Sequence, residues 1–267
     1  MKKYQYFYET IMEVKITILG TGTSQGIPVI GSSHPVCLSK NPKDKRLRVS
    51  AMFEVYGKRL IIDCGPDFRQ QMLKQEISSI NAMLFTHEHA DHTAGIDDLR
   101  PFYFRQGNLQ CYMTVRVHNA LKERFSYIFT TVNKYPGVAT LDVHEFENEP
   151  FEVDGIPVVP VLADHGFIPV HGYRIGDVAY MTDVKTIAHG EKEKLKNLDV
   201  LIINMLRVEA HATHLNLEEA LDLVRELQPK RTYFTHISHH LGFHNEVQKT
   251  LPENVFLAYD NLEITSH

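Results

Sequence analysis

Short apolar runs separated by glycines and polar turns make up the first quarter of the chain. Residues 15–19, 51–55 and 60–62 combine β-branched or aromatic side chains with the length of ordinary strands. Further apolar runs of strand length recur later, at residues 82–85, 158–162, 178–182 and 231–235. The first part of the chain is therefore predicted to be rich in strands.

A different spacing appears at residues 217–227. Ala220, Leu221, Val224 and Leu227 form an apolar stripe with helical period. Asn216 stands at the capping position, Glu219 at the reciprocal position of a capping box, and Pro229 ends the pattern. Strands and helices that interleave in this way predict an α/β fold.

Three histidines and a carboxylate crowd the turn that follows the apolar run 82–85. The segment 87–92 reads His-x-His-x-Asp-His, with His87, His89, Asp91 and His92. Imidazole nitrogens and carboxylate oxygens are the ligands that borderline divalent metals take. An ordinary surface turn would have to produce this spacing by chance, so we interpret the segment as a metal site.

Three other apolar runs lead to a residue of the same kind. The run 158–162 leads to His165, the run 178–182 to Asp183 and the run 231–235 to His236. Open α/β sheets place their active sites at the carboxyl ends of strands. Each residue alone would be an ordinary turn residue, but their repeated placement predicts ligands of one metal centre.

Two other patterns invite functional readings. Gly20, Gly22 and Gly26 do not fit the dinucleotide fingerprint, whose third glycine would fall at Gln25, so we predict a tight loop lining the metal cleft. A basic run predicts a solvated loop, with the alternative that Arg48 reaches a substrate phosphate. Its members are Lys40, Lys43, Lys45, Arg46 and Arg48.

Bulk properties narrow the class of protein. With 267 residues and 43% hydrophobic content, we expect one domain over residues 14–267 with a substantial core, and the net charge of −5 favours a small substrate over nucleic acid as the partner. Residues 1–13 are predicted to be an extension without chemistry. No apolar stretch approaches the ~20 residues of a membrane span, and no signal peptide is evident, so we expect a cytoplasmic protein. The sequence also allows a homodimer. The three scattered cysteines, Cys37, Cys64 and Cys111, make a disulfide framework improbable.

The ligand order resembles the metallo-β-lactamase superfamily, in particular its dinuclear phosphodiesterases. The segments 20–28 (GTGTSQGIP), 63–66 (DCGP), 180–183 (YMTD), 235–239 (THISH) and 257–260 (LAYD) resemble the phosphoribosyl cyclic phosphate phosphodiesterases of phosphonate breakdown. Those enzymes are relatives of the tRNA 3′-end-processing endonucleases, tRNase Z. The resemblance implies the αββα four-layer sandwich.

The resemblance also implies roles for the ligands. His87, His89 and His165 would hold one divalent ion, Asp91, His92 and His236 a second, and Asp183 would bridge them. Water trapped between two such ions has its pKa lowered towards ~7, so hydroxide is available at neutral pH. Asp91 would also orient that nucleophile. Zinc and manganese are the expected metals, and the ligands suit iron too.

Phosphodiester cleavage needs a proton for the leaving group, and the resemblance assigns it to His214, close to the helix cap at Asn216. A plain helix-entry residue is the alternative. Glu209 would orient His214 or be an ordinary surface carboxylate. Other histidines are interpreted as surface residues or as residues that contact the metal ligands; they are His171, His189, His211, His239 and His240.

The loop at residues 31–37 departs from the resembled subfamily. Members carry G-C-x-C-P-V-C there and hold a structural zinc, whereas this chain reads G-S-S-H-P-V-C. His34, Cys37 and His244 would supply only three strong ligands where structural zinc takes four. We expect a loop held by packing without a tightly bound metal, with a vestigial site as the alternative.

The lengths of the segments between and after the predicted ligands limit the class of substrate. Only 18 residues separate His165 from Asp183 (183 − 165), which leaves no room for the long arm that tRNase Z carries in this interval. Residues 237–267 are too few for the extra domain of a glutathione-thioester hydrolase, and a flavodiiron enzyme would have a carboxylate in place of His89. Small phosphodiesters, cyclic ones first, are the predicted substrates. The alternatives are a nuclease acting on RNA ends and a non-catalytic metal-binding scaffold.

Overall fold

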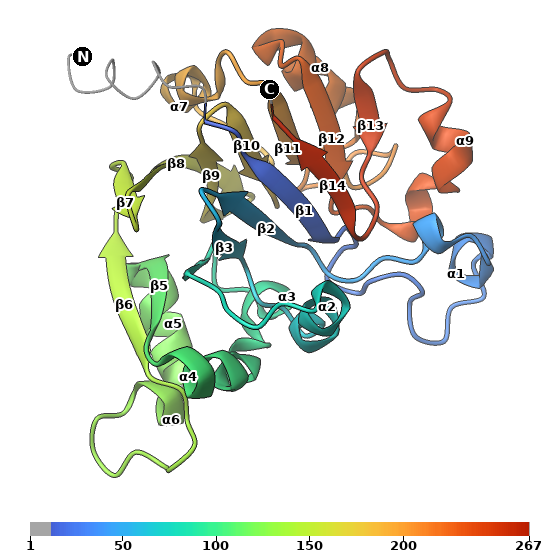
Figure 1. Ribbon diagram of the computed structural model, residues 1–267. Helices are drawn as coiled ribbons and strands as arrows, with labels where there is room; N and C mark the ends of the chain where they lie inside the picture. The colour runs from blue at the N-terminus through green and yellow to red at the C-terminus, as the bar shows by residue number, and fades with distance from the viewer. Residues whose placement is uncertain (1–11, 267) are drawn as a thin grey trace.

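Two seven-stranded sheets pack face to face in the computed structural model, which describes residues 12–266 (Figure 1). The first sheet has the order β14 (Leu262–Thr265), β1 (Lys15–Gly20), β2 (Ser50–Val55), β3 (Lys58–Ile62), β4 (Ala82–Leu84), β5 (Leu109–Thr114) and β6 (Leu141–Phe146). The second has the order β13 (Val255–Leu257), β12 (Arg231–Thr235), β11 (Val200–Asn204), β10 (Val178–Met181), β9 (Ile168–Ile175), β8 (Ile156–His165) and β7 (Phe151–Val153).

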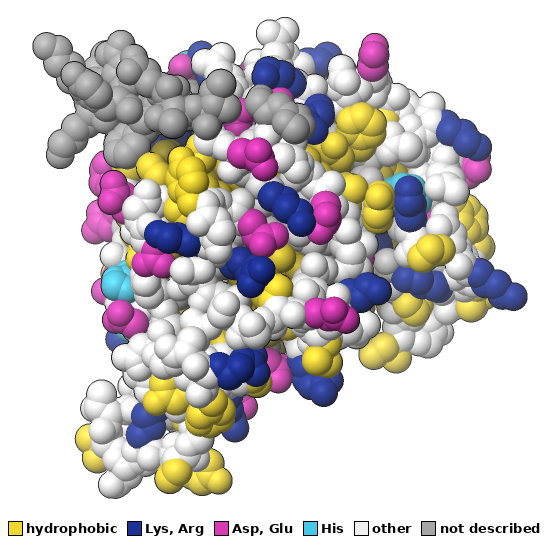
Figure 2. All heavy atoms as spheres, viewed as in Figure 1, with side chains coloured by type: hydrophobic (Ala, Val, Ile, Leu, Met, Phe, Trp, Pro, Cys, Tyr) yellow, Lys and Arg dark blue, Asp and Glu magenta, His cyan; other side chains and the backbone are white. Residues whose placement is uncertain are grey.

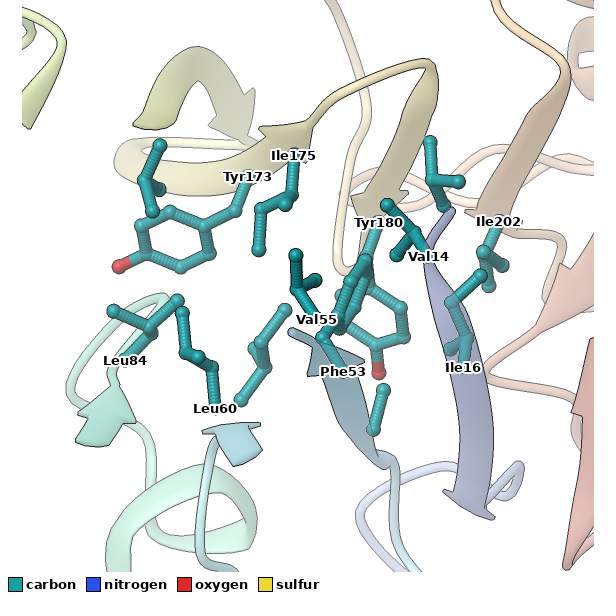
Figure 3. Packing of buried hydrophobic residues seen from close by; sticks show 14 of the residues in the cluster. Val14, Ile16, Phe53, Val55, Leu60, Leu84, Tyr173, Ile175, Tyr180 and Ile202 are labelled. Atoms are coloured by element: carbon teal, nitrogen blue, oxygen red, sulfur yellow. The ribbon is translucent and has the colours of Figure 1, made fainter. Parts of the chain in front are cut away.

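Successive side chains along a strand point alternately into the space between the two sheets and towards the outer face of their own sheet. In β3, Leu60 and Ile62 enter the cluster between the sheets, whereas Ile61 points to the other side. In β10, Tyr180 points inward and Ala179 outward. Figure 3 shows side chains of both sheets meeting in this central layer. Because both faces of each sheet are buried, these strands read as continuous apolar runs in the sequence.

Helices cover the outer face of each sheet. Phe68 of α2 (Phe68–Gln75), Phe102 of α4 (Arg100–Gln106) and Leu121 of α5 (Val115–Arg124) pack on the first sheet. Leu223 of α8 (Leu217–Leu227) and Val247 of α9 (His244–Gln248) pack on the second. The αββα sandwich predicted from the resemblance is confirmed.

Strand direction brings the ends of several strands to one edge. Strands β3 to β6 run parallel, as do β10 to β13. Strand β8 has the direction of β10, because both are antiparallel to β9. The shorter elements are α1 (Pro35–Leu38), α3 (Ala90–Thr93), α6 (Ser126–Phe129), α7 (His189–Lys192), and the 3₁₀ turns η2 (Pro42–Asp44), η3 (Ile96–Leu99), η4 (Glu193–Leu195) and η5 (His239–Leu241).

The helix predicted at residues 217–227 is observed with the same bounds as α8. Asn216 accepts a hydrogen bond from the backbone N–H of Glu219 at 2.9 Å, and the Glu219 carboxylate accepts one from the backbone N–H of Asn216 at 3.0 Å. Gln228 ends the helix in the left-handed conformation, with φ 51°, just before Pro229. The capping box therefore begins the helix as predicted, and the helix ends before Pro229 as predicted.

The amino-terminal segment is covered only in part. The predicted extension 1–13 falls mostly on residues 1–11, which lie outside the described residues. Met12 packs against the central cluster, so the packed structure begins slightly earlier than predicted. None of the helices in residues 12–266 has the length and apolarity needed to cross a bilayer.

We predict that Asn216→Ala lowers the free energy of unfolding by about 1 kcal/mol, because the backbone N–H of Glu219 loses its acceptor at the start of α8. Urea titration followed by circular dichroism measures the change. Asp222→Ala on the same helix is the control, since Asp222 forms only an exposed ion pair with Arg225 and should change stability by less than about 0.5 kcal/mol. Equal effects of the two substitutions would contradict the capping role.

Candidate metal centre

All seven predicted ligands lie at the ends of strands on one edge of the sandwich. His87 and His89 follow β4, and Asp91 and His92 lie in the short helix α3 that comes next. From the second sheet, His165 is the last residue of β8, Asp183 follows β10 and His236 follows β12. The two sheets therefore each contribute to one site.

The side chains form two groups that match the sets implied by the resemblance. Ligand atoms of His87, His89 and His165 lie within 4.8 Å of one another. The same holds for the second set, Asp91, His92 and His236. Asp183 joins both neighbourhoods, since it groups with His87 and His92 on one side and with His165 and His214 on the other.

Asp183 lies at the centre of the cluster and is only 2% exposed. Its Oδ2 is 3.2 Å from His92 Nε2, and its Oδ1 is 3.1 Å from His236 Nε2. Burial alone would raise the pKa of Asp183, but His236 and His92 hold it well below its usual range. Burial alone would lower the pKa of His92, but Asp183 and Asp91 raise it well above its usual range.

Three residues at the site have left-handed backbone conformations without being glycine. Asp63, Asp183 and His236 have φ values of 62°, 59° and 54°, each directly after a strand or one residue beyond it. Such conformations are costly for residues with a Cβ and persist where the surrounding structure holds them. The turn redirects each side chain from the sheet towards the cluster.

Hydrogen bonds to the second ring nitrogen orient several histidines. Asp63 Oδ2 accepts from His92 Nδ1 at 2.7 Å, and the two Asp63 oxygens also accept from the backbone N–H and hydroxyl of Thr86. His165 Nδ1 donates to the Thr213 carbonyl at 2.8 Å. These contacts leave Nε2 of His92 and His165 for a metal.

Two of the orienting residues were missed in the sequence analysis. Asp63 lies in the motif 63–66 without a predicted role, although it follows an apolar strand as Asp183 does. Asn204 is fully buried, and its side chain accepts from Val184 N at 2.6 Å and donates to Val184 O at 2.9 Å. It thereby fixes the backbone that follows Asp183, and no local pattern marks it.

Buried nitrogen atoms without hydrogen bonds indicate that metal ions fit the site. His92 Nε2 and both ring nitrogens of His236 are buried and have no hydrogen bond of acceptable geometry, although Asp183 lies 3.1–3.2 Å from two of them. Such groups are costly in a protein interior unless something binds them. Burial also lowers the pKa of His87 well below its usual range, which keeps it neutral as a metal ligand must be.

His214 is part of the cluster, and its neighbours differ from the prediction. Its Nε2 is 3.1 Å from Asp183 Oδ1, while its Nδ1 is 3.0 Å from Thr213 Oγ1 and 3.1 Å from His211 Nδ1. Burial lowers the pKa of His214 to about 4, although the hydrogen bond to Asp183 raises it. The exposed carboxylate of Glu209 lies 3.9 Å from Arg207 instead. Of the two alternatives for Glu209, the structure places it as a surface carboxylate, and His211 lies beside His214.

The centre opens into a cleft with a volume of about 340 Å³. Five of the ligands line it, and so do residues 23–25 of the glycine-rich loop, as predicted. The remaining lining residues are Leu206, Arg207, His211, His214, Ser238, His239 and His240. The cleft therefore has polar walls around the metal ligands.

The basic run is largely bound within the protein, which corrects the prediction of a solvated loop. Arg48 donates to the Asp67 carboxylate at 3.0 Å and to the Ser24 carbonyl at 3.1 Å, and it does not line the cleft. Arg46 is only 4% exposed. His171 is also buried rather than on the surface, and its backbone N–H donates to the carbonyl of Thr86.

The three residues of the vestigial zinc site are not grouped as metal ligands among residues 12–266. His34 packs its ring against His239 and His240, with centroids 4.9 Å and 5.7 Å away. His244 instead lies against Arg46, with Nδ1 3.1 Å from Nη2. Cys37 accepts a hydrogen bond from Val29 N. His34 and His244 therefore have different neighbours in the structure.

Comparisons with known proteins agree with this arrangement. The β-lactamase superfamily domain profile matches residues 58–237. A solved structure, described as a new diphosphatase from the PhnP family, is 39% identical and superposes with a TM-score of 0.89, covering 95% of this chain and 97% of that one.

Two curated relatives are longer proteins. An octanoyltransferase of Porphyromonas gingivalis is 40% identical over 94% of this chain, and a ribonuclease Z of Clostridium kluyveri is 30% identical over 70% of it. The chain spans about half the length of these curated relatives, 51% and 55%. The sequence resemblance is confirmed: this chain belongs to the β-lactamase superfamily, in the branch that contains the PhnP-family diphosphatase and the ribonucleases Z.

Proposed function

We propose that this protein is a metal-dependent phosphodiesterase that hydrolyses small phosphodiesters, cyclic ones first. The main support for this proposal is the arrangement of the ligand side chains. Two sets of three ligands, His87, His89 and His165 against Asp91, His92 and His236, converge from both sheets, with the carboxylate of Asp183 between them. This arrangement fits a pair of divalent ions with a shared carboxylate ligand.

Two bound divalent ions would polarise phosphoryl oxygens and make water acidic enough to supply hydroxide near neutral pH. The protein's own residues would do the rest. Asp91 is partly exposed to the cleft and can accept a hydrogen bond from the attacking water. His214 lines the same cleft beside Asp183, so its Nε2 can reach the departing oxygen. Burial lowers the pKa of His214, and the negative charge of a docked phosphate would raise it again, so that His214 could carry a proton when the substrate is bound.

The region between His165 and Asp183 supports a small substrate. Strand β8 turns at Gly166, with φ 67°, and returns at once as β9, which pairs with both neighbouring strands. No arm leaves the described chain in this interval. The face in Figure 2, where few histidines are visible, mixes basic and acidic side chains. An RNA-end nuclease, the activity that the ribonuclease Z names indicate, is therefore the second candidate.

Acyl transfer, the activity in the name of the Porphyromonas relative, finds less support in this chain. A covalent acyl transfer needs an accessible nucleophile, and the three cysteines are all buried. Burial raises the pKa of the Cys64 thiol and that of the Cys111 thiol. A non-catalytic scaffold is disfavoured because it has no need of an open cleft over its ligands.

We predict that native mass spectrometry of the zinc-loaded chain shows two ions, and that His236→Ala retains one. His240→Ala, at the rim of the same cleft, is the matched control and should keep both. Cys37→Ser should also keep both, since Cys37 joins no ligand group. One ion in the unaltered chain, or a third ion that disappears with Cys37, would contradict this ligand assignment.

The zinc- or manganese-loaded protein is expected to cleave bis(p-nitrophenyl) phosphate and a ribose cyclic phosphate, and to leave a labelled precursor tRNA intact. The measurement is product release with each substrate before and after chelation. Cleavage of the tRNA alone would favour the nuclease. No cleavage of any phosphodiester at full metal loading would favour the scaffold.

We predict that His214→Ala retains both metal ions. Its loss of activity should be larger for a substrate with a poorer leaving group. General acid catalysis contributes about 10²–10⁴-fold, so a sugar alkoxide should be released that much more slowly. Nitrophenolate leaves without a proton, and its release should fall far less. His189→Ala, on the exposed helix α7, is the control. Equal losses on both substrates would assign His214 to substrate binding, and loss of an ion would make it a ligand.

A further inference from the structure

Arg46 places a buried cation close to the metal centre. Its backbone pairs with Ile27 in both directions, N–H to carbonyl at 2.9 Å and 2.8 Å. The glycine-rich loop comes close enough that a Cβ at Gly22 or Gly26 would lie 3.0 Å or 3.1 Å from the Arg46 carbonyl oxygen. Arg46 is thus packed directly beneath the loop that lines the cleft.

The guanidinium of Arg46 joins three segments that are far apart in the sequence. Nη1 donates to Thr21 Oγ1 at 2.8 Å and to the Ala258 carbonyl at 2.7 Å. Nη2 lies 3.1 Å from His244 Nδ1, which must accept because a guanidinium has no acceptor. One side chain therefore connects the loop after β1, the loop after β13 and the start of α9.

Two carboxylates balance this cation. Asp260 accepts from Thr21 Oγ1 at 2.6 Å and from Leu47 N at 2.7 Å. Asp44, 2% exposed, accepts from His244 N at 2.7 Å. Burial lowers the pKa of Arg46 to about 10, which leaves it charged at neutral pH. Removing one partner of such a buried network leaves the others without compensation.

The same network holds the backbone on both sides of His236. The carbonyl of Thr21 accepts from Ile237 N, the residue after His236, at 2.8 Å. The N–H of Ala258 donates to the carbonyl of Phe234, two residues before His236, at 2.9 Å. Both Thr21 and Ala258 are bound by the same Nη1 of Arg46.

His236 depends on its backbone more than other ligands do. His92 is oriented by Asp63 and His165 by the Thr213 carbonyl, whereas His236 has no hydrogen bond on either ring nitrogen. Its position follows from a left-handed backbone, with φ 54°, between Phe234 and Ile237. The ring lies 3.1 Å from Asp183 Oδ1 and is stacked on His214, with centroids 4.7 Å apart, so a change in that backbone would move the ring relative to both.

We propose that Arg46 is the positioning residue of His236: its guanidinium fixes the chain on both sides of this ligand and thereby sets the affinity of the second metal position. The proposal rests on the metal centre proposed above, and on neither the substrate nor the reaction. Zinc affinity is therefore the appropriate measurement.

The experiment compares two single-ion backgrounds. His89→Ala damages the first position and leaves the ion at the second, whereas Asp91→Ala damages the second and leaves the ion at the first. Arg46→Met is added to each, and zinc affinity is measured against a chromophoric chelator. We expect about 10–100-fold weaker binding in the His89→Ala background, the usual effect of losing a group that orients a ligand, and less than threefold change in the Asp91→Ala background.

Controls separate positioning from general damage. Arg46→Lys keeps the charge and should restore part of the affinity, while Arg59→Met, which breaks a partly exposed ion pair with Glu54, should change neither position. If Arg46→Met does not fold, Thr21→Val interrupts the same connection and should show the same selectivity. Equal weakening in both backgrounds, or no weakening in either, would overturn the proposal. A chain that binds zinc with this selectivity but cleaves no phosphodiester would overturn only the proposed function.

Discussion

A carboxylate buried as deeply as that of Asp183 is stable only when cations or hydrogen-bond donors surround it, because water cannot reach it. The fold supplies them from both sheets: His92 comes from the first, and His236 and His214 come from the second. Bound metal ions would take over the same role with more charge. The geometry of the centre therefore follows from the requirement to compensate one negative charge at the edge of the sandwich.

Surrounding the buried charge of Asp183 requires several unfavourable backbone conformations, and neighbouring residues hold these conformations in place. Asp183 is held from behind by Asn204, which binds both backbone groups of Val184. Asp63 is held by its hydrogen bonds from Thr86 and His92. Left-handed non-glycine residues at three strand ends thus mark where the fold stores strain to aim side chains at one point.

The candidate metal ligands could be predicted because each belongs to a local pattern, either the His-x-His-x-Asp-His turn or a short apolar run followed by a histidine or an aspartate. The α8 cap was equally local, with Asn216 and Glu219 three residues apart. The layer order of the sandwich came from the family resemblance rather than from spacing, and the structure bears it out. Asp63 was within reach of the same reasoning, since it too ends an apolar run.

One error and two alternatives that the sequence left open have a common physical origin. Arg46 looked like one member of a solvated basic run, because its partners Thr21, His244 and Ala258 lie far away in the sequence. His34 and His244 could not be separated from other histidine pairs without knowing that α9 turns His244 towards Arg46. Glu209 lies five residues from His214, yet that short interval does not bring the two side chains together. Long-range contacts decided all three.

The glycine-rich loop connects the wall of the cleft to the candidate metal centre in this fold. Residues 23–25 line the cleft, while Thr21 and Gly22, a few residues earlier, contact Ile237 beside a metal ligand. Arg46 binds the loop through the carbonyl that faces Gly22 and Gly26 and through the hydroxyl of Thr21. A side chain added at Gly22 would press on that carbonyl, and the displacement would pass to Ile237 as well as to the cleft wall. Glycine at this position therefore preserves the candidate metal centre and the wall of the cleft together.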